Sequence, residues 1–340
     1  MSAVLTVEDL RVWYGTDRGP VRAVDGVSFE IGSGETLGLV GESGCGKSTL
    51  GRGIMGLLPR GAVMDGTIEF GGRNLVGLGD RDLRRLRGPE IGLIFQEPMT
   101  RLNPLMRIED HFKETLETHE PNLTDAELRR RALDALGRMG IPPTRFRQYP
   151  HEFSGGMRQR IMIALALVLR PKLVIADEPT TALDVLVEAQ IITILDDLKR
   201  NSDTSLLLIT HNLGIVAEAC ERVAVMYAGW IVEEGDARTV FSDPAHPYTR
   251  ELLRSVISLN TTELNYIPGA PPDLADPPRA CRFHPRCPNA MEVCAQKDPI
   301  EVRAATGQRV RCWLHGPEEE IPPGAEEPLE REAIAIAEEA

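Results

Sequence analysis

The chain has 340 residues, of which 42% are apolar, and its 38 basic and 51 acidic residues give a formal charge of −13. Residues 317–340 contain nine Glu and one Arg and so carry −8 of that charge, leaving a mildly acidic body. Such a body argues against non-specific DNA binding, which depends on Lys and Arg neutralising phosphates, and we expect no nucleic-acid partner. The longest apolar run, 161–169, is far shorter than the roughly 20 residues of a membrane-spanning helix.

Short apolar runs alternate with segments of helical period along the chain. The expected strands cover 4–12, 21–31, 36–40, 91–95, 173–176, 206–210 and 223–227. The expected helices cover 125–139, 155–169, 186–200 and 213–221. This alternation predicts an α/β fold with a mostly parallel core sheet. The first two strands and the segment 223–235 are more typical of antiparallel pairing.

Composition divides the chain into three parts. We expect one α/β domain over 1–260, with a helical subdomain at about 97–165. A small, irregular, Pro- and Cys-rich module follows at 261–316, where prolines are too dense for regular structure. The acidic tail 317–340 is predicted to be disordered because it combines like charge with few large apolar residues. The first residues have no basic stretch followed by an apolar one, so we expect no signal peptide and a cytosolic protein.

The segment 41–48, Gly-Glu-Ser-Gly-Cys-Gly-Lys-Ser, matches the phosphate-binding pattern G-x-x-x-x-G-K-[ST]. It follows an expected strand and precedes a helical stretch, as the pattern requires. Glycines allow backbone N–H groups to point at phosphate oxygens, and the helix start adds a favourable field. The predicted phosphate contacts are Gly41, Ser43, Gly44, Gly46, Lys47, Ser48 and Thr49, with Ser48 also offered to Mg²⁺. The alternative is a glycine-rich turn that happens to contain a lysine.

Four polar residues follow expected strands, whose carboxyl ends line the ligand crevice of a parallel sheet. Asp177 is predicted to hold Mg²⁺, and Glu178 to polarise an attacking water as general base. Gln96 is predicted to contact Mg²⁺ and the water, and His211 to bond a γ-phosphate oxygen. The alternatives are a surface acid for Glu178, a solvated loop residue for Gln96 and a structural role for His211.

Ser154-Gly155-Gly156 opens the expected helix 155–169 and forms a second glycine-rich helix start. It therefore offers a second possible anion site. One nucleotide rarely needs two such sites in one chain, so this one is expected to close on a nucleotide held by another subunit. The alternative is a simple N-cap by Ser154.

These motifs together resemble the ATP-binding subunits of ABC transporters. The P-loop, Gln96, Ser154-Gly-Gly, Asp177-Glu178, Ala182-Leu-Asp184 and His211 occur in that family's order over about residues 4–260. The resemblance implies an ATPase that works as a head-to-tail dimer, with two ATP between the P-loop of one subunit and the Ser154 loop of the other. It also implies that Asp184 links the two sites and that Tyr14 stacks on adenine, unless Tyr14 is a core aromatic.

Three further segments are similar to the branch that serves oligopeptide and dipeptide importers: 95–104, 149–160 and 246–250. The resemblance implies a second ATPase subunit, paralogous or identical, two integral-membrane permease subunits and an extracytoplasmic solute-binding protein reached through the permease. It implies a peripheral location on the cytoplasmic face of the cell membrane. Nickel and glutathione importers share the branch, so those solutes stay open. A soluble ABC ATPase acting on nucleic acid or ribosomes is the alternative of another class.

Four cysteines stand in the Pro-rich module, at 281, 287, 294 and 312. In a cytosolic protein they are expected to be ligands or thiols rather than disulfides. No C-x₂₋₄-C pair of the kind that structural zinc sites favour is present, so the spacing leaves an iron–sulfur cluster, Zn²⁺ and free thiols open. His284 and His315 are possible substitute ligands. The segment from Ile267 to Cys312 resembles the C-terminal extension of the peptide-importer branch, which in some members binds a [4Fe–4S] cluster. The resemblance therefore favours a cluster here, held by Cys281, Cys287, Cys294 and Cys312.

Overall fold

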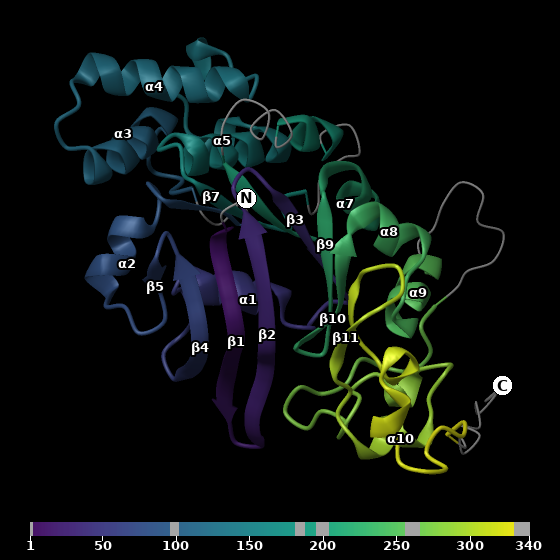
Figure 1. Cartoon of the computed structure of the whole chain (residues 1–340). Helices are drawn as coiled ribbons and strands as arrows, with labels where there is room; N and C mark the ends of the chain where they lie inside the picture. Colours follow the sequence, from purple (N-terminus) through teal and green to yellow (C-terminus); the bar gives the residue numbers. More distant parts are fainter. Residues whose placement is uncertain (1–2, 96–101, 181–187, 195–203, 256–265, 330–340) are drawn as a thin grey trace, which may run out of the picture.

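A computed structural model describes residues 3–95, 102–180, 188–194, 204–255 and 266–329. Its main sheet has eight strands in the order β11-β12-β10-β9-β3-β8-β7-β6 (Figure 1). Five neighbours pair in parallel: β9 (Arg222–Tyr227), β3 (Thr36–Val40), β8 (Ser205–Ile209), β7 (Leu173–Asp177) and β6 (Ile91–Ile94). Every residue of β3, β7 and β8 is buried, which is why these strands are continuous apolar runs in the sequence. The predicted parallel core is confirmed.

A second sheet is antiparallel, in the order β2-β1-β4-β5. Its strands are β1 (Ala3–Thr16), β2 (Gly19–Gly32), β4 (Ala62–Phe70) and β5 (Arg73–Asn74). Helix α1 (Lys47–Ile54) packs against strands of both sheets, and one hydrophobic core joins all three elements. Gly46, which precedes α1, therefore lies where the two sheets meet.

The helical part contains α3 (Ile108–His119), α4 (Asp125–Arg138) and α5 (Gly155–Leu167), which lie together at the top of the molecule in Figure 1, and α5 packs against the edge strand β6. Helix α4 begins with a capping box in which the Thr124 side chain and the Glu127 carboxylate each accept the other residue's backbone N–H. A separate apolar core fills this part and reaches the sheet through α5. Of the expected helix 186–200, residues 188–194 are described and helical.

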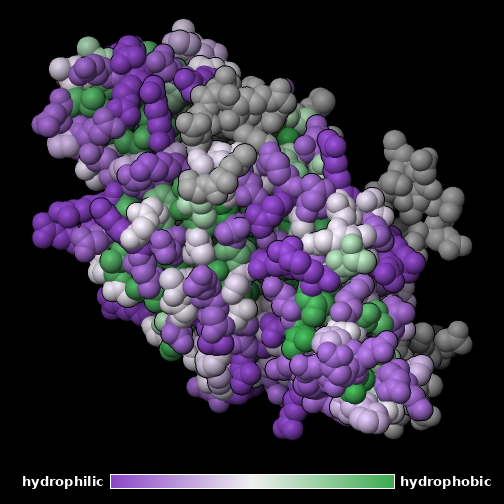
Figure 2. Space-filling view, viewed as in Figure 1, coloured by the Kyte–Doolittle hydropathy of each residue, from purple (hydrophilic) through white to green (hydrophobic). Residues whose placement is uncertain are grey.

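Further helices cover the remaining edges: α2 (Asp80–Leu86), α7 (Leu213–Ala219), α8 (Ala237–Ser242), α9 (Pro247–Arg254) and α10 (Glu292–Gln296). Short 3₁₀ turns stand at Pro143–Arg145, Pro150–Glu152, His284–Arg286, Trp313–His315 and Glu318–Glu320. Over the described ranges, no helix is both long and apolar enough to cross a membrane. On the face shown in Figure 2, hydrophilic side chains predominate and apolar ones gather in small separate patches.

The Cys-rich module differs from the expected irregular structure. Its strands β11 (Glu301–Arg303) and β12 (Arg309–Arg311) extend the main sheet, because β12 pairs antiparallel with β10 (Trp230–Asp236). The prolines that suggested irregularity stand before these strands, so they do not interrupt the pairing. The predicted boundary near residue 260 falls outside the described residues.

The prediction of disorder is wrong for residues 317–329 of the acidic tail. The Val293 N–H donates to Ala325 O at 2.9 Å, and the Leu329 N–H donates to Ala290 O at 3.0 Å. Ala325 is 5% exposed and packs in the same core as Phe283 and Trp313. The packing of Ala325 and Leu329 against this core, together with the backbone hydrogen bonds, therefore outweighs the run of like charge.

Candidate functional site

The P-loop joins β3 to α1 and is pressed against two other strands. Gly46 has φ +112°, and a Cβ atom built there would lie 1.9 Å from the Ala23 carbonyl oxygen of β2. Gly41 has φ +152°, and its Cβ would lie 2.1 Å from Met226 O of β9. Both positions accept only glycine, for conformation and for space. The two glycines that the motif fixes thus have a packing reason as well as a phosphate-binding one.

Lys47 is buried at 7% exposure and turns back into its own loop. Its Nζ donates to Gly41 O at 2.8 Å and to Glu42 O at 3.0 Å. An ammonium group has three donors, so loop carbonyls hold the charge in the position where phosphate oxygens would replace them. Ser43 and Gly44 lie exposed on top of the loop.

Ser48 and Asp177 come together at the start of α1 and the end of β7. The Ser48 hydroxyl donates to Asp177 Oδ1 at 2.8 Å. Burial raises the pKa of Asp177, and the Ser48 hydrogen bond opposes this shift in part. A hydroxyl and a carboxylate in contact are the oxygen ligands that Mg²⁺ takes in phosphate sites, so the pair fits the predicted metal role.

Glu178 is 7% exposed and has a backbone φ of +51°, an uncommon value for a residue with a side chain. Its N–H donates to Ile209 O of β8 at 2.8 Å, which fixes this conformation. His211 Nδ1 contacts the Glu178 carboxylate oxygens at 2.8 and 2.9 Å. The structure thus brings two predicted residues into direct contact, a pairing that the sequence did not indicate. Strain at such a position is typical of functional sites.

Ser154 caps α5, since its hydroxyl accepts the Met157 N–H at 3.4 Å. Ser154 and Gly155 are nevertheless exposed, and Gly156 is half-buried, so the helix start remains open to an outside group. The sequence missed one link from this helix: buried Gln159 donates through Nε2 to Pro179 O at 2.6 Å. That bond ties α5 to the segment that follows Glu178.

Tyr14 of β1 is half-buried and donates from its hydroxyl to Thr49 Oγ1 at 3.3 Å. It therefore lies beside the first turn of α1, next to the predicted phosphate contacts. Gln96 and Asp184 lie outside the described residues. Sequence reasoning also missed Tyr248 and Arg286, which both contact Glu42 of the P-loop.

The four cysteines of the module are all buried, and none of them forms a disulfide bond. Burial, with Cys294 nearby, raises the pKa of Cys281 to about 12, and the pKa of Cys312 is also raised by burial and by the three other thiols. Among the described residues, no group of three or more His, Cys, Asp or Glu side chains is placed to hold a metal ion. His284 and His315 instead contact the carbonyls of Cys281 and Ala245.

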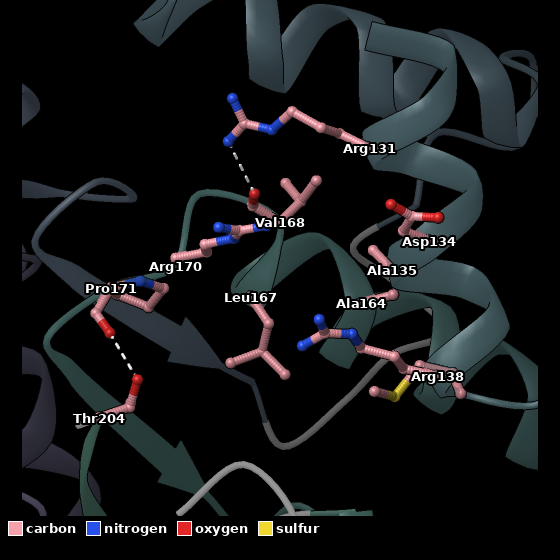
Figure 3. Close-up of a pocket in the computed structure, with 11 residues that line it drawn as sticks. Arg131, Asp134, Ala135, Arg138, Ala164, Leu167, Val168, Arg170, Pro171 and Thr204 are labelled. Atoms are coloured by element: carbon pink, nitrogen blue, oxygen red, sulfur yellow. Dashed lines mark hydrogen bonds between the residues drawn. The ribbon is translucent and has the colours of Figure 1, made fainter. Parts of the chain in front are cut away.

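A cavity of about 280 Å³ lies between α4 and the C-terminal end of α5 (Figure 3). Arg131, Arg138 and Arg170 line it, and Arg131 donates to Val168 O. Its lining residues Pro171 and Thr204 precede β7 and β8, so the cavity is at the amino ends of these strands. Asp177 is at the carboxyl end, and the cavity therefore takes no part in the phosphate site.

Comparison with known proteins agrees with this geometry. The family described as "ABC transporter" matches residues 24–181, and the family "Oligopeptide/dipeptide transporter, C-terminal region" matches 232–294. The chain is 48% identical over 320 residues to the dipeptide transport ATP-binding protein DppD of Bacillus subtilis, covering 92% of this chain and 95% of that protein. It is 49% identical over 304 residues to the oligopeptide transport ATP-binding protein OppD of Salmonella typhimurium, covering 88% and 90%.

Solved structures are similar over the α/β part. A dimeric post-hydrolysis state of an ATP-binding cassette bound to ADP and Pi superposes with a TM-score of 0.63 at 26% identity, covering 69% of this chain and 99% of that one. CbiO1 of Clostridium perfringens, part of an ABC transporter complex, gives a TM-score of 0.62 at 29% identity, covering 72% and 92%.

Proposed function

The chain belongs to the ABC transporter family of ATP-binding subunits, in its peptide-transport branch, and we propose that it hydrolyses ATP to power the uptake of di- or oligopeptides. The contact between Ser48 and Asp177, with buried Glu178 immediately beside it, carries this proposal. It supplies the oxygen ligands and the carboxylate that phosphoryl transfer to water requires. Peptides are proposed as the solute because the relatives' names and the match at 232–294 agree.

In the proposed reaction, Lys47 and the N–H groups of the P-loop bind the β- and γ-phosphates. Ser48 and Asp177 would hold Mg²⁺, with Gln96 as a further ligand, and the ion would neutralise charge on the phosphates. Glu178 orients a water molecule and draws its proton as the water attacks. The His211 contact fixes the Glu178 carboxylate, and His211 is proposed to reach a γ-phosphate oxygen. Tyr14 is proposed to stack on adenine.

The proposed working form is a dimer of ATPase subunits, identical or paralogous. The exposed start of α5 at Ser154, Gly155 and Gly156 would close on the nucleotide of the other subunit, and Asp184 would link the two sites. The subunits would sit peripherally on the cytoplasmic face of a membrane, against two permease subunits. An extracytoplasmic solute-binding protein would deliver the peptide to the permease.

Glu178→Gln tests the assignment of the base, because it keeps the shape of the side chain and removes its basicity. We expect Mg²⁺-dependent phosphate release to fall by at least about a hundredfold, the lower range for a general base, while ATP binding and ATP-induced dimerisation persist. Glu30→Gln, at an exposed position of β2, is the control and should keep full activity. Undiminished turnover in Glu178→Gln would remove Glu178 from this role.

We further propose that Cys281, Cys287, Cys294 and Cys312 bind a [4Fe–4S] cluster, with Zn²⁺ as the alternative. The support is that four buried thiols, none of them in a disulfide, stand in one small module; in the structure they are not gathered into a metal-binding group, so loading would have to bring them together. Arg282, Arg286 and Arg311 each stand next to one of these cysteines in the sequence, although Arg282 and Arg286 already pair with Asp25 and Glu42. The raised pKa of Cys281 means that loading must displace protons, so affinity should increase with pH.

Anaerobic purification tests this module. We expect the anaerobically purified protein to show an absorption band at about 400 nm and to contain iron and sulfide in equal amounts. Cys294→Ser should abolish both, whereas Cys220→Ser, outside the module, should keep them. An iron-free protein with one bound zinc would contradict the cluster in favour of the alternative.

A further inference from the structure

Glu42, the first variable residue of the P-loop, is held from three directions. Its backbone N–H donates to the Tyr248 hydroxyl at 2.9 Å. Its carbonyl accepts from Lys47 Nζ at 3.0 Å. Its carboxylate accepts two hydrogen bonds from Arg286, at 2.7 and 3.0 Å. Two of these three partners come from beyond the α/β core, from α9 and from the Cys-rich module.

Arg286 is fixed before it reaches Glu42. It is 7% exposed, and its Nε donates to Pro268 O at 2.8 Å. Its Nη2 also donates to Ile267 O at 3.2 Å, and its Nη1 to the Tyr227 hydroxyl at 3.3 Å. A guanidinium held at all three nitrogens presents a rigid fork to a carboxylate. This differs from an exposed ion pair, whose side chains must first be ordered.

Charge explains why such a partner is useful at this position. Glu42 stands in the loop that is proposed to receive the phosphates of ATP, and its side chain is 22% exposed. Left unpaired, a negative charge this close to phosphate groups would repel them, and partial burial would strengthen the repulsion. Paired with Arg286, the same carboxylate is neutralised and becomes an anchor for the loop.

We propose that Arg286 is a positioning residue for ATP binding, which neutralises the Glu42 carboxylate so that it does not repel the phosphates, while Tyr248 holds the backbone of the same residue. The inference rests on the nucleotide site proposed above. Arg286 immediately precedes Cys287, so this side chain links the cysteine module directly to the P-loop.

The test is a set of ATP dissociation constants measured by calorimetry on the full chain with Mg²⁺. Arg286→Ala is expected to weaken binding about tenfold, equal to 1.4 kcal/mol. Arg286→Lys should fall between, since it restores charge without the fork. Glu42→Gln alone should bind ATP at least as tightly as the wild type. The double variant Arg286→Ala/Glu42→Gln should recover most of the loss, because the unpaired carboxylate is gone.

The control is Arg309→Ala, which removes another arginine of the module, one that pairs with Glu234 and not with the P-loop. It should leave the ATP dissociation constant unchanged. A double variant as weak as Arg286→Ala would mean that the unpaired Glu42 carboxylate is not what weakens binding, and would overturn the proposal. If Arg286→Ala does not fold, weaker binding in Glu42→Gln overturns it instead. A wild type that does not bind ATP would contradict the proposed function itself.

Discussion

Two glycines of the P-loop provide a matched pair for testing how the loop is built. Gly46 and Gly44 both have positive φ, at +112° and +82°. A Cβ at Gly46 would meet the Ala23 carbonyl oxygen at 1.9 Å, whereas a Cβ at Gly44 would meet nothing within 4 Å. Replacing either by alanine therefore introduces the same kind of backbone strain, but only Gly46→Ala also introduces a clash with fixed backbone.

The expected magnitudes follow from this difference. Strain alone costs about 1–2 kcal/mol for a residue with left-handed conformation, so Gly44→Ala should weaken ATP binding by at most about 5- to 30-fold, even if all of the strain opposes binding. At Gly46 the contact must lengthen by about 1 Å before two heavy atoms fit, and Lys47 moves with it. Because the clash adds to the strain, we expect Gly46→Ala to weaken ATP binding more than Gly44→Ala does, by on the order of a hundredfold, the factor that a misplacement of about 1 Å can cost in catalysis.

Binding of a fluorescent ATP analogue, with thermal unfolding as a check on integrity, measures both variants. Gly46→Ala should lose affinity while α1 and both sheets remain folded by circular dichroism. Equal losses in the two variants would refute the role of the Ala23 contact. Wild-type affinity in Gly46→Ala would show that the loop yields without consequence, and would refute the reasoning on packing.

Two further predictions concern stability. His246 is buried, with its Nδ1 accepting the Tyr248 N–H at 3.0 Å, and burial, with His315 and Arg250 adding repulsion, lowers its pKa from 6.5 to about 3. The unfolded chain takes up a proton near pH 6.5 that the folded chain refuses, so urea unfolding should show stability falling by about 1.4 kcal/mol per pH unit below 6.5, with a shallower fall in His246→Gln. Phe112→Ala should lower the free energy of unfolding by about 3–5 kcal/mol, because Phe112 is fully buried and packs on Phe146. Nucleotide titration of the folded variant should nevertheless show unchanged ATP affinity. A loss of ATP affinity in the folded variant would contradict the separation of the two cores.

Local signals in the sequence predicted the α/β core well. The buried run 36–40 is observed as β3 with the same bounds, and the predicted strand 173–176 ends one residue later, at Asp177. The P-loop was identified because its pattern is contiguous, so no long-range contact is needed to see it. Glu178 and His211 were found separately, because each follows a strand, and the parallel order of β7 and β8 accounts for their meeting.

Contacts between distant segments could not be predicted in this way. Arg286 and Glu42 are 244 positions apart, and neither stands in a pattern that points to the other. The ordering of residues 317–329 was missed for the same reason, since it depends on carbonyls and amides of α10 and its neighbours rather than on composition. Composition gives the charge and the apolar content of a segment, but not which distant part of the chain it packs against.

These long-range contacts change the status of the Cys-rich module. Its strand β12 continues the main sheet, its Arg282 pairs with Asp25 of β2, and the Arg22 N–H of β2 donates to Leu274 O at 2.9 Å. Phe283 packs edge-on against Tyr227 and Tyr248, so the module shares a core with β9 and α9. A module attached by sheet, core and ion pair cannot shift without shifting strands on which the P-loop rests. The four cysteines are therefore mechanically connected to the P-loop, and Arg286 provides the shortest of these connections.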